Sequence, residues 1–374
     1  MYLSWMHGAG RTPSGSAFSL KTPAFSILDD YREMGTLYID RKDLEIRLDG
    51  YAMAFYANGV REGIVPIKPL KRIVMVGNIT IETPVLHRLA DEGVSVIFLS
   101  GKTQRYRGVF HGRLHNNGLL RLMQYKKSGP PFAAEFSKEI MVKKITLQKA
   151  LLDDASKERH DLRTILCRGI STLESVIEKI NNMGLDIEIE SLMGFEGGAA
   201  ASYFAAYTSL FPESLRFTKR TKRPPRDPVN AVLSLTYTLL HYEVVREIES
   251  IGLDPFIGFY HQFDYGRESL ACDIVEPYRP CVDRWVWELF RKRTFTGRDF
   301  NEGDERPGCY LKKEGRSRYY VLYEEWADGI RKMIRDEVQL LSRRIMDGQD
   351  IVPEREQGDD GSEGRSFAID NDGE

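Results

Sequence analysis

The segment Met123–Glu135, MQYKKSGPPFAAE, separates two parts of the chain whose apolar residues repeat with different periods. Before it, short alternating or continuous apolar runs are separated by turn residues such as Asn58-Gly59, a pattern typical of β-strands. After it, apolar residues recur every three to four positions over long stretches, as in amphipathic helices. The sequence therefore predicts an α+β protein in which a β-rich N-terminal domain precedes a larger all-helical C-terminal domain.

The boundaries follow from these periods. We expect the β-rich domain over residues 35–125, a linker with Gly129-Pro130-Pro131 over 126–135, and the helical domain over 136–346. The predicted strands are GTLYID, DLEIRLDG, YAMAFYANG, VREGIVPI, RIVMVG, VSVIFLS and QRYRGVFHG, with one helix over 82–93. Helices are predicted over 136–155, 161–182, 186–210 and 227–251, another from about 267, and a last one over 319–346. Residues 1–34 form an irregular extension, and 347–374 a disordered acidic tail.

Charge is distributed unevenly along the 374 residues. The formal net charge is −2, but residues 347–374 hold ten acidic residues against two arginines, so the remaining body is mildly basic. A basic body is compatible with a polyanionic partner without requiring one. The four cysteines show neither CxxC pairs nor zinc spacing, as expected of free cysteines in a reducing cytoplasm. No apolar run approaches the ~20 residues of a bilayer span, so neither a membrane segment nor a signal peptide is predicted.

One candidate functional carboxylate, Glu196, lies inside an otherwise apolar helical pattern and precedes Gly197-Gly198. Because each glycine costs a helix roughly 1 kcal/mol relative to alanine, the pair suggests that another group approaches the backbone closely. The alternative interpretation is a solvated surface glutamate beside a helix contact.

A second group follows the helix that ends near Gly252. His261 lies in a predicted loop, where a structural hydrogen bond is the alternative role. Asp273 and Glu276 are three positions apart on one helix face, and Pro277 places Glu276 at a helix end or kink. Alternatively, Glu276 is a carboxylate paired with a nearby arginine, Arg279 or Arg284.

Together, Glu196, His261 and Glu276, with Asp273 as support, form an oxygen-rich set with one nitrogen. Such a set suits Mg²⁺ or Mn²⁺ better than zinc, which prefers more histidine or cysteine. A bridging cation would also remove the repulsion between these carboxylates and nucleic-acid phosphates. The combination points to metal-assisted phosphodiester chemistry.

A basic run, RFTKRTKRPPRDPVNA, begins at Arg216 and has no acidic residue before Asp227. Its prolines favour a loop, which we expect to bind DNA phosphates, although a solvated surface loop is the alternative. Two further arginines flank the proposed metal ligands. The predicted DNA-binding residues are Arg216, Lys219, Arg220, Lys222, Arg223, Arg226, Arg267 and Arg279.

The strings EGGAAASYF, KRPPRDPVNAVLSLTYTLL and GLDPFIGFYHQFDYGRESLACDIVEPYRP resemble the CRISPR adaptation integrases, the first family of CRISPR-associated proteins. The resemblance is densest over residues 190–285 and covers about 35–346. It implies a homodimer formed through the β-rich domain and one divalent metal site in the helical domain. By motif match, the ligands are Glu196, His261 and Glu276, with Asp273 beside them and Asn230 and Tyr237 as supports.

The resemblance further implies that the protein inserts new spacer DNA into a CRISPR repeat, the incoming 3′-OH attacking a repeat phosphodiester, and that it also cleaves DNA. Partners would be DNA and a small ferredoxin-like adaptation protein in a 4:2 complex, with an iron–sulfur end-trimming nuclease in some subtypes. The residues alone do not distinguish integration from hydrolysis. A stand-alone structure-specific nuclease and a DNA-binding scaffold with an inactive metal site therefore remain alternatives.

Overall fold

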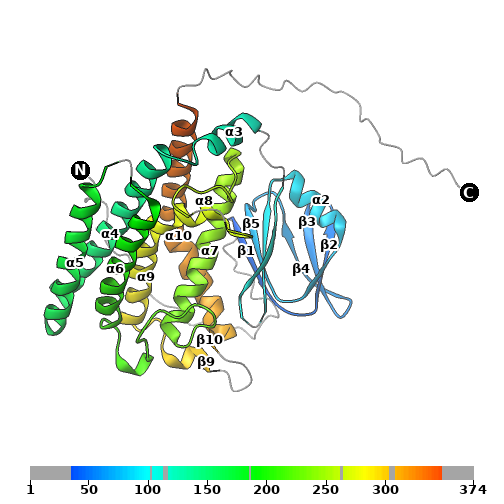
Figure 1. The fold of residues 1–374 in the computed structure, drawn as a ribbon. Coiled ribbons are helices and arrows are strands. Elements are labelled where there is room, and N and C mark those ends of the chain that lie inside the picture. The colour runs from blue at the N-terminus through cyan, green and yellow to red at the C-terminus, as the bar shows by residue number, and fades with distance from the viewer. Residues whose placement is uncertain are drawn as a thin grey trace, which may run out of the picture.

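The structure, a computed structural model, describes residues 35–101, 103–112, 117–184, 187–261, 264–302 and 308–347. The expectations for the N-terminal extension and, beyond Asp347, for the acidic tail fall outside these residues. Figure 1 shows the β-rich part and the helical part lying side by side. Within the described residues, no helix is both long enough and apolar enough to cross a membrane.

The N-terminal part contains two four-stranded sheets. The first has the order β1 (Thr36–Asp40), β5 (Arg72–Val76), β7 (Ser95–Leu99) and β8 (Tyr106–Phe110), with only β8 antiparallel to its neighbour. The second has the order β4 (Val60–Pro66), β3 (Ala52–Ala57), β2 (Leu44–Asp49) and β6 (Ile79–Ile81), with β6 parallel to β2. Among the described residues of this part, one helix, α2 (Thr83–Asp91), accompanies the sheets. The predicted β-rich architecture is confirmed, although β6 was not predicted.

The first sheet is buried on both faces, which explains the uninterrupted apolar run of β5. Val74 and Val76 pack in the core shared with the helices, whereas Ile73 and Met75 pack in the core between the two sheets. Because successive side chains of a strand point to opposite faces, a strand between two cores must be apolar throughout.

The C-terminal part is mostly helical. Its helices are α3 (Gly118–Lys126), α4 (Phe132–Glu158), α5 (Arg163–Asn181), α6 (Ile189–Thr208), α7 (Pro228–Ile251), α8 (Ser269–Val275), α9 (Arg279–Arg291) and α10 (Lys313–Met346). The start of α7 is as predicted: the side chain of Asp227 accepts a hydrogen bond from the Asn230 backbone N–H, and Pro228 occupies the first turn. A small antiparallel hairpin, β9 (Phe300–Glu302) and β10 (Cys309–Leu311), corrects the expectation of an entirely helical domain.

The connection between the two parts differs from the expected linker. Residues 118–126 form α3, which packs on the helical part: the Gln124 side chain donates hydrogen bonds to the carbonyls of Asp254 and Ile257, at 2.9 and 2.7 Å. Helix α4 already begins at Phe132, because proline is tolerated immediately before and at the start of a helix. The irregular connection at this point is therefore only residues 127–131.

Four buried charged residues join the two parts, and we call them the interdomain ionic cluster: Arg72, Glu243, Glu324 and Arg331. Arg72 of β5 lies 2.8 Å from Glu243 of α7, and Arg331 of α10 contacts both glutamates at 2.6 to 2.9 Å. Glu324 also accepts a 2.6 Å hydrogen bond from the Tyr38 hydroxyl of β1. This cluster fixes the sheets against the helices.

Candidate active site

The two glutamates at the centre of the predicted metal site are brought together by a lysine that the sequence analysis did not select. Lys144 of α4 places its Nζ 2.5 Å from Oε1 of Glu196, on α6, and 2.6 Å from Oε2 of Glu276, at the end of α8. Lys144 and Glu276 are each 6% exposed, whereas the Glu196 side chain is partly accessible. The structure therefore brings Glu196 and Glu276 to one cation position, and an ammonium occupies it.

Glu276 lies at the predicted kink. Helix α8 ends at Val275, a single 3₁₀ turn spans Glu276–Tyr278, and α9 follows. Oε1 of Glu276 accepts a 2.8 Å hydrogen bond from Nε of Arg279, so the alternative pairing with Arg279 is present as well. Burial opposes ionisation, but Arg279 and Lys144 together lower the pKa of Glu276 to about 2. The carboxylate is thus charged at neutral pH.

His261 is held by Asp273. Its Nδ1 lies 2.7 Å from Oδ1 of Asp273, which is fully buried and also accepts from the backbone N–H groups of Phe259, Tyr260 and His261. Because an ionised carboxylate can only accept, Nδ1 is the donor in this contact, and the neutral imidazole then carries its lone pair on Nε2. Gly258 makes the contact possible: a Cβ there would lie 2.8 Å from Oδ2 of Asp273.

Two observations fit a divalent cation here, the donor types and the single partner of one oxygen. Oε2 of Glu276 is buried, and its one close partner among the described contacts is the Lys144 ammonium, so a different cation could take that place. In the part of the chain that the structure describes, however, no three His, Cys, Asp or Glu side chains converge closely enough to bind a metal ion as they stand. A three-ligand site requires rearrangement around Lys144.

Among the described residues, no protein group approaches the two glycines after Glu196, because a Cβ on Gly197 or Gly198 would meet no heavy atom within 4 Å outside its own helix. Their effect is to leave the surface of α6 next to Glu196 open.

The basic run forms a loop between the 3₁₀ turn Glu213–Leu215 and α7. Arg220 is its most constrained cation: Nη1 donates to Asn230 Oδ1 at 2.7 Å and to Ser234 Oγ at 3.1 Å. Asn230 also donates to the Lys219 carbonyl and, through Oδ1, accepts from the Thr221 backbone N–H. The predicted support residue Asn230 therefore folds the basic loop.

Tyr237 of α7 organises the other side of this loop. The guanidinium groups of Arg220 and Arg279 lie 5.4 and 5.0 Å from its ring centroid, which is the geometry of cation–π contacts. The Tyr237 hydroxyl donates to Asp283, which also accepts from Tyr203 at 2.8 Å. Burial raises the pKa of Asp283 to about 6 despite these donors.

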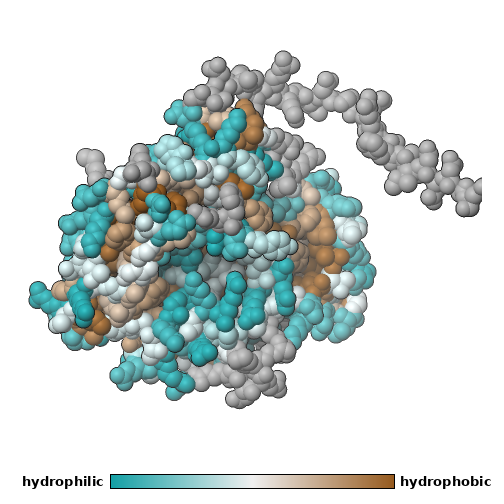
Figure 2. Space-filling model, viewed as in Figure 1, coloured by the Kyte–Doolittle hydropathy of each residue, from teal (hydrophilic) through white to brown (hydrophobic). Residues whose placement is uncertain are grey.

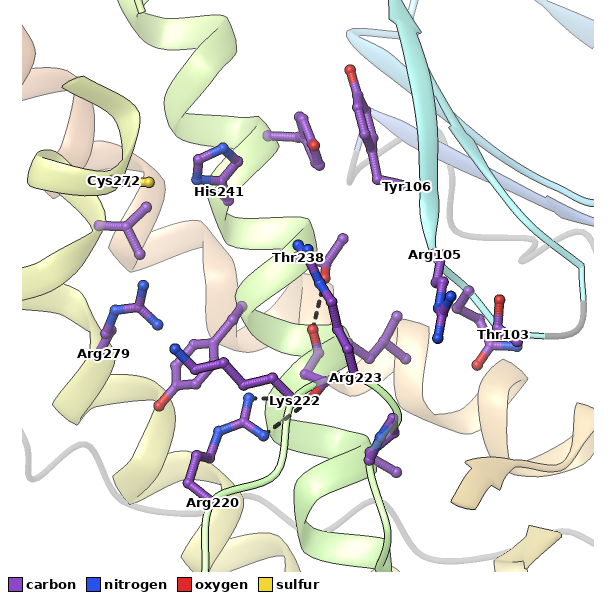
Figure 3. Close-up of a pocket in the computed structure, with 18 of the residues that line it drawn as sticks. Thr103, Arg105, Tyr106, Arg220, Lys222, Arg223, Thr238, His241, Cys272 and Arg279 are labelled. Atoms are coloured by element: carbon purple, nitrogen blue, oxygen red, sulfur yellow. Dashed lines mark hydrogen bonds between the residues drawn. The ribbon is translucent and has the colours of Figure 1, made fainter. Parts of the chain in front are cut away.

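The loop borders a cavity of about 690 Å³ between α7, α8 and the N-terminal sheet. Figure 3 shows Lys222, Arg223 and Arg279 extending toward this space, with Arg105 and Tyr106 of the N-terminal part on the opposite wall. Burial, Arg279 and Arg220 lower the pKa of Lys222, which indicates uncompensated positive charge. Five of the predicted DNA-binding residues line the cavity: Arg220, Lys222, Arg223, Arg267 and Arg279. The other three, Arg216, Lys219 and Arg226, do not.

Sequence reasoning missed Lys144 and the contribution of Arg105 and Tyr106. A signal for Lys144 existed: it falls on the stripe of α4 that also carries Met141 and Gln148 and faces the core. A lysine on a buried stripe needs a partner, so it marks a nearby carboxylate. Tyr106 stacks on Tyr242 of α7 with centroids 3.6 Å apart, a contact between domains that no local pattern reveals.

The comparisons with known proteins agree with this architecture. The family model described as CRISPR associated protein Cas1 matches residues 37–325. A relative named CRISPR-associated endonuclease Cas1 1, from Thermodesulfovibrio yellowstonii, is 51% identical over 319 residues, covering 85% of this chain and 99% of the relative. The solved structure of a Cas1 protein from Thermotoga maritima is similar in fold, with a TM-score of 0.72 and 24% identity over 86% of this chain and 99% of that one.

A chain in a partial Cas6-RT-Cas1–Cas2 complex is 25% identical, with a TM-score of 0.56, and the match covers 83% of this chain and 95% of that chain. The match of the family model to most of the chain, together with the extensive identity to the Thermodesulfovibrio relative, shows that this chain belongs to the Cas1 family of CRISPR-associated proteins.

Proposed function

We propose that this protein is a divalent-metal-dependent DNA integrase of CRISPR adaptation, with Mg²⁺ or Mn²⁺ as its cofactor. The 3′-OH of an incoming DNA strand attacks a phosphorus atom of the repeat. A new P–O bond forms, the bond to the repeat's own 3′ oxygen breaks, and that oxygen leaves with a proton. The observation that carries the proposal is the single cation position shared by Glu196 and Glu276 beside a basic cavity.

The side chains of the site have different roles in the proposed reaction. Glu196 and Glu276 would hold the metal ion with His261 Nε2 as the nitrogen ligand, and Asp273 keeps the proton on Nδ1. The bound ion would polarise the scissile phosphate and stabilise charge on the attacking and leaving oxygens. Arg279 orients Glu276, and the cations of the cavity bind the DNA backbone.

Hydrolysis is the second candidate activity, because a relative half identical to this chain carries the name endonuclease. It would use the same site, with water in place of the 3′-OH, and the displacement at phosphorus is otherwise unchanged.

We propose a homodimer formed through the β-rich domain, two of which assemble with a Cas2-type partner. In support, a chain 25% identical to this one occurs in a partial Cas6-RT-Cas1–Cas2 complex. Strand β4 supports the dimer, because it is an edge strand with Val60 67% and Ile64 47% exposed. Figure 2 shows hydrophobic residues gathered on the β-rich side of this face. We also propose that an end-trimming nuclease can act together with this assembly.

A strand-transfer assay tests the function. The protein, its Cas2-type partner, Mn²⁺ and a labelled DNA duplex are mixed with a supercoiled plasmid that carries the repeat. We expect joined products from wild type and from Glu190→Gln, an exposed site on α6, but none from Glu196→Gln or His261→Ala. Nicks without joining would favour the nuclease. DNA binding with neither product would favour the inactive scaffold and contradict the proposal.

A further inference from the structure

Lys144 is buried and charged, yet the proposed mechanism gives it no role. It projects from the core-facing side of α4 and is 6% exposed. A buried ammonium is tolerated only where opposite charges compensate its lost hydration, and here Glu196 and Glu276 supply them. These are the two carboxylates of the proposed metal site.

The carboxylates need a cation even when no metal is bound. Arg279 neutralises Oε1 of Glu276 but forms no ion pair with Glu196 among the described contacts. Without Lys144, two partly desolvated carboxylates would face each other across a low-dielectric space, and this repulsion would favour their separation. Lys144 thus keeps Glu196 and Glu276 at one position.

The same arrangement makes Lys144 and a metal ion mutually exclusive. Mg²⁺ binds carboxylate oxygens at about 2.1 Å, so an ion bound by both glutamates would occupy the space that Nζ occupies at 2.5 and 2.6 Å. Repulsion between the two cations adds to the steric conflict. A metal ion can bind only if the ammonium withdraws.

We propose that Lys144 is a resident counter-cation: it holds Glu196 and Glu276 in place in the metal-free protein and is displaced when the divalent ion binds. This inference rests on the proposed metal-dependent function. Lys144 is a positioning residue, and its exchange with the metal lowers metal affinity while protecting the empty site from charge repulsion.

The test is a Mn²⁺ titration of the purified protein by calorimetry, combined with melting temperatures without and with Mn²⁺. For Lys144→Met we expect Mn²⁺ to bind on the order of tenfold more tightly, because its competitor is gone. The metal-free variant should melt about 5 °C lower, and Mn²⁺ should restore the loss. Lys149→Met is the matched control, because Lys149 lies on the same helix between Asp153 and Glu174 at the surface. The control should behave as wild type.

Unchanged or weaker Mn²⁺ binding by Lys144→Met would overturn the inference while leaving the metal site intact. If wild type also binds no Mn²⁺, the proposed function fails with it. A second measurement needs no variant: Mg²⁺ should increase the labelling of Lys144 by an amine-reactive reagent several-fold relative to Lys149, as mapped by mass spectrometry. Labelling that Mg²⁺ leaves unchanged would contradict displacement even if the variant did not fold.

Discussion

Two buried ionic clusters of this protein differ in one respect. In the interdomain ionic cluster, all four oxygens of Glu243 and Glu324 accept hydrogen bonds from arginine, tyrosine or threonine. In the candidate active site, Oε2 of Glu276 lacks a well-formed hydrogen bond, and Glu196 remains partly accessible. We call the first cluster completed because all its carboxylate oxygens are hydrogen-bonded, although the buried Nε of Arg72 has no hydrogen bond among the described residues. A completed cluster fixes structure, whereas an incomplete one can accept a different cation.

The substitution Arg331→Met should have the largest effect on the completed cluster. Both glutamates would lose their shared guanidinium while remaining buried, so we expect the free energy of unfolding to fall by about 3–5 kcal/mol. Urea denaturation measures the change. Arg335→Met, one turn further along α10, removes a half-exposed arginine that contacts Glu247 and should cost less than about 1 kcal/mol. Equal losses in the two variants would refute the special role of Arg331.

Acid should act on the same cluster. Burial opposes the charge of Glu243, but Arg72 and Arg331 lower its pKa to about 2, against an ordinary value of 4.5. A depressed carboxyl pKa stabilises the fold above pH 4.5, and this contribution is lost as the pH falls toward 2. Between pH 5 and 3, Glu243→Gln should therefore lose up to about 2 kcal/mol less stability than wild type. If the free energies of unfolding of wild type and Glu243→Gln fell in parallel between pH 5 and 3, the pKa of Glu243 would not be lowered by these arginines.

The incomplete cluster at the candidate active site can be tested through Asp273, which orients His261. Asp273→Asn would replace one acceptor oxygen with an amide and disturb the His261 ring. Changes in such second-layer residues typically lower metal affinity or activity 10- to 100-fold, and we expect a loss in this range. Calorimetry with Mn²⁺ and the strand-transfer assay provide the measurements. Asp264→Asn, at an exposed site in the same segment, should change neither, and a loss there would indicate a general effect on the loop.

The smallest expected effect concerns the cavity beside the incomplete cluster. Lys222→Gln combined with Arg223→Gln should reduce the steepness of the salt dependence of DNA binding by about 1 to 2 in the log–log slope. Fluorescence anisotropy at several salt concentrations measures this slope. Arg226→Gln, in the same loop but outside the cavity, should leave it nearly unchanged. A larger effect of Arg226 would locate the DNA elsewhere on the loop.

Local sequence patterns were sufficient for most of the fold. The Asp227-Pro228 start of α7, the kink at Pro277 and the apolar run of β5 each depend on neighbouring residues, and each was predicted. The helix α3 was missed because its assignment to the helical part depends on Gln124, whose partners lie about 130 positions away.

The candidate site was predicted less completely. Its carboxylates and imidazole were selected through unusual placement and family resemblance, but their contacts depend on tertiary structure. Spacing on α4 could mark Lys144 as buried, but not its partners, because it reaches Glu196 and Glu276 only after α4, α6 and α8 have packed together. The Tyr106–Tyr242 stack likewise exists only because β8 meets α7.

The absence of a side chain at Gly258 has a practical meaning for protein engineering. The loop that carries His261 wraps so closely around the Asp273 carboxylate that a methyl group would collide with it. The orientation of His261 therefore depends on both Asp273 and Gly258, and the three residues would have to be transferred together. A designer who transplants the imidazole to another scaffold without the other two would obtain a ring with no fixed orientation.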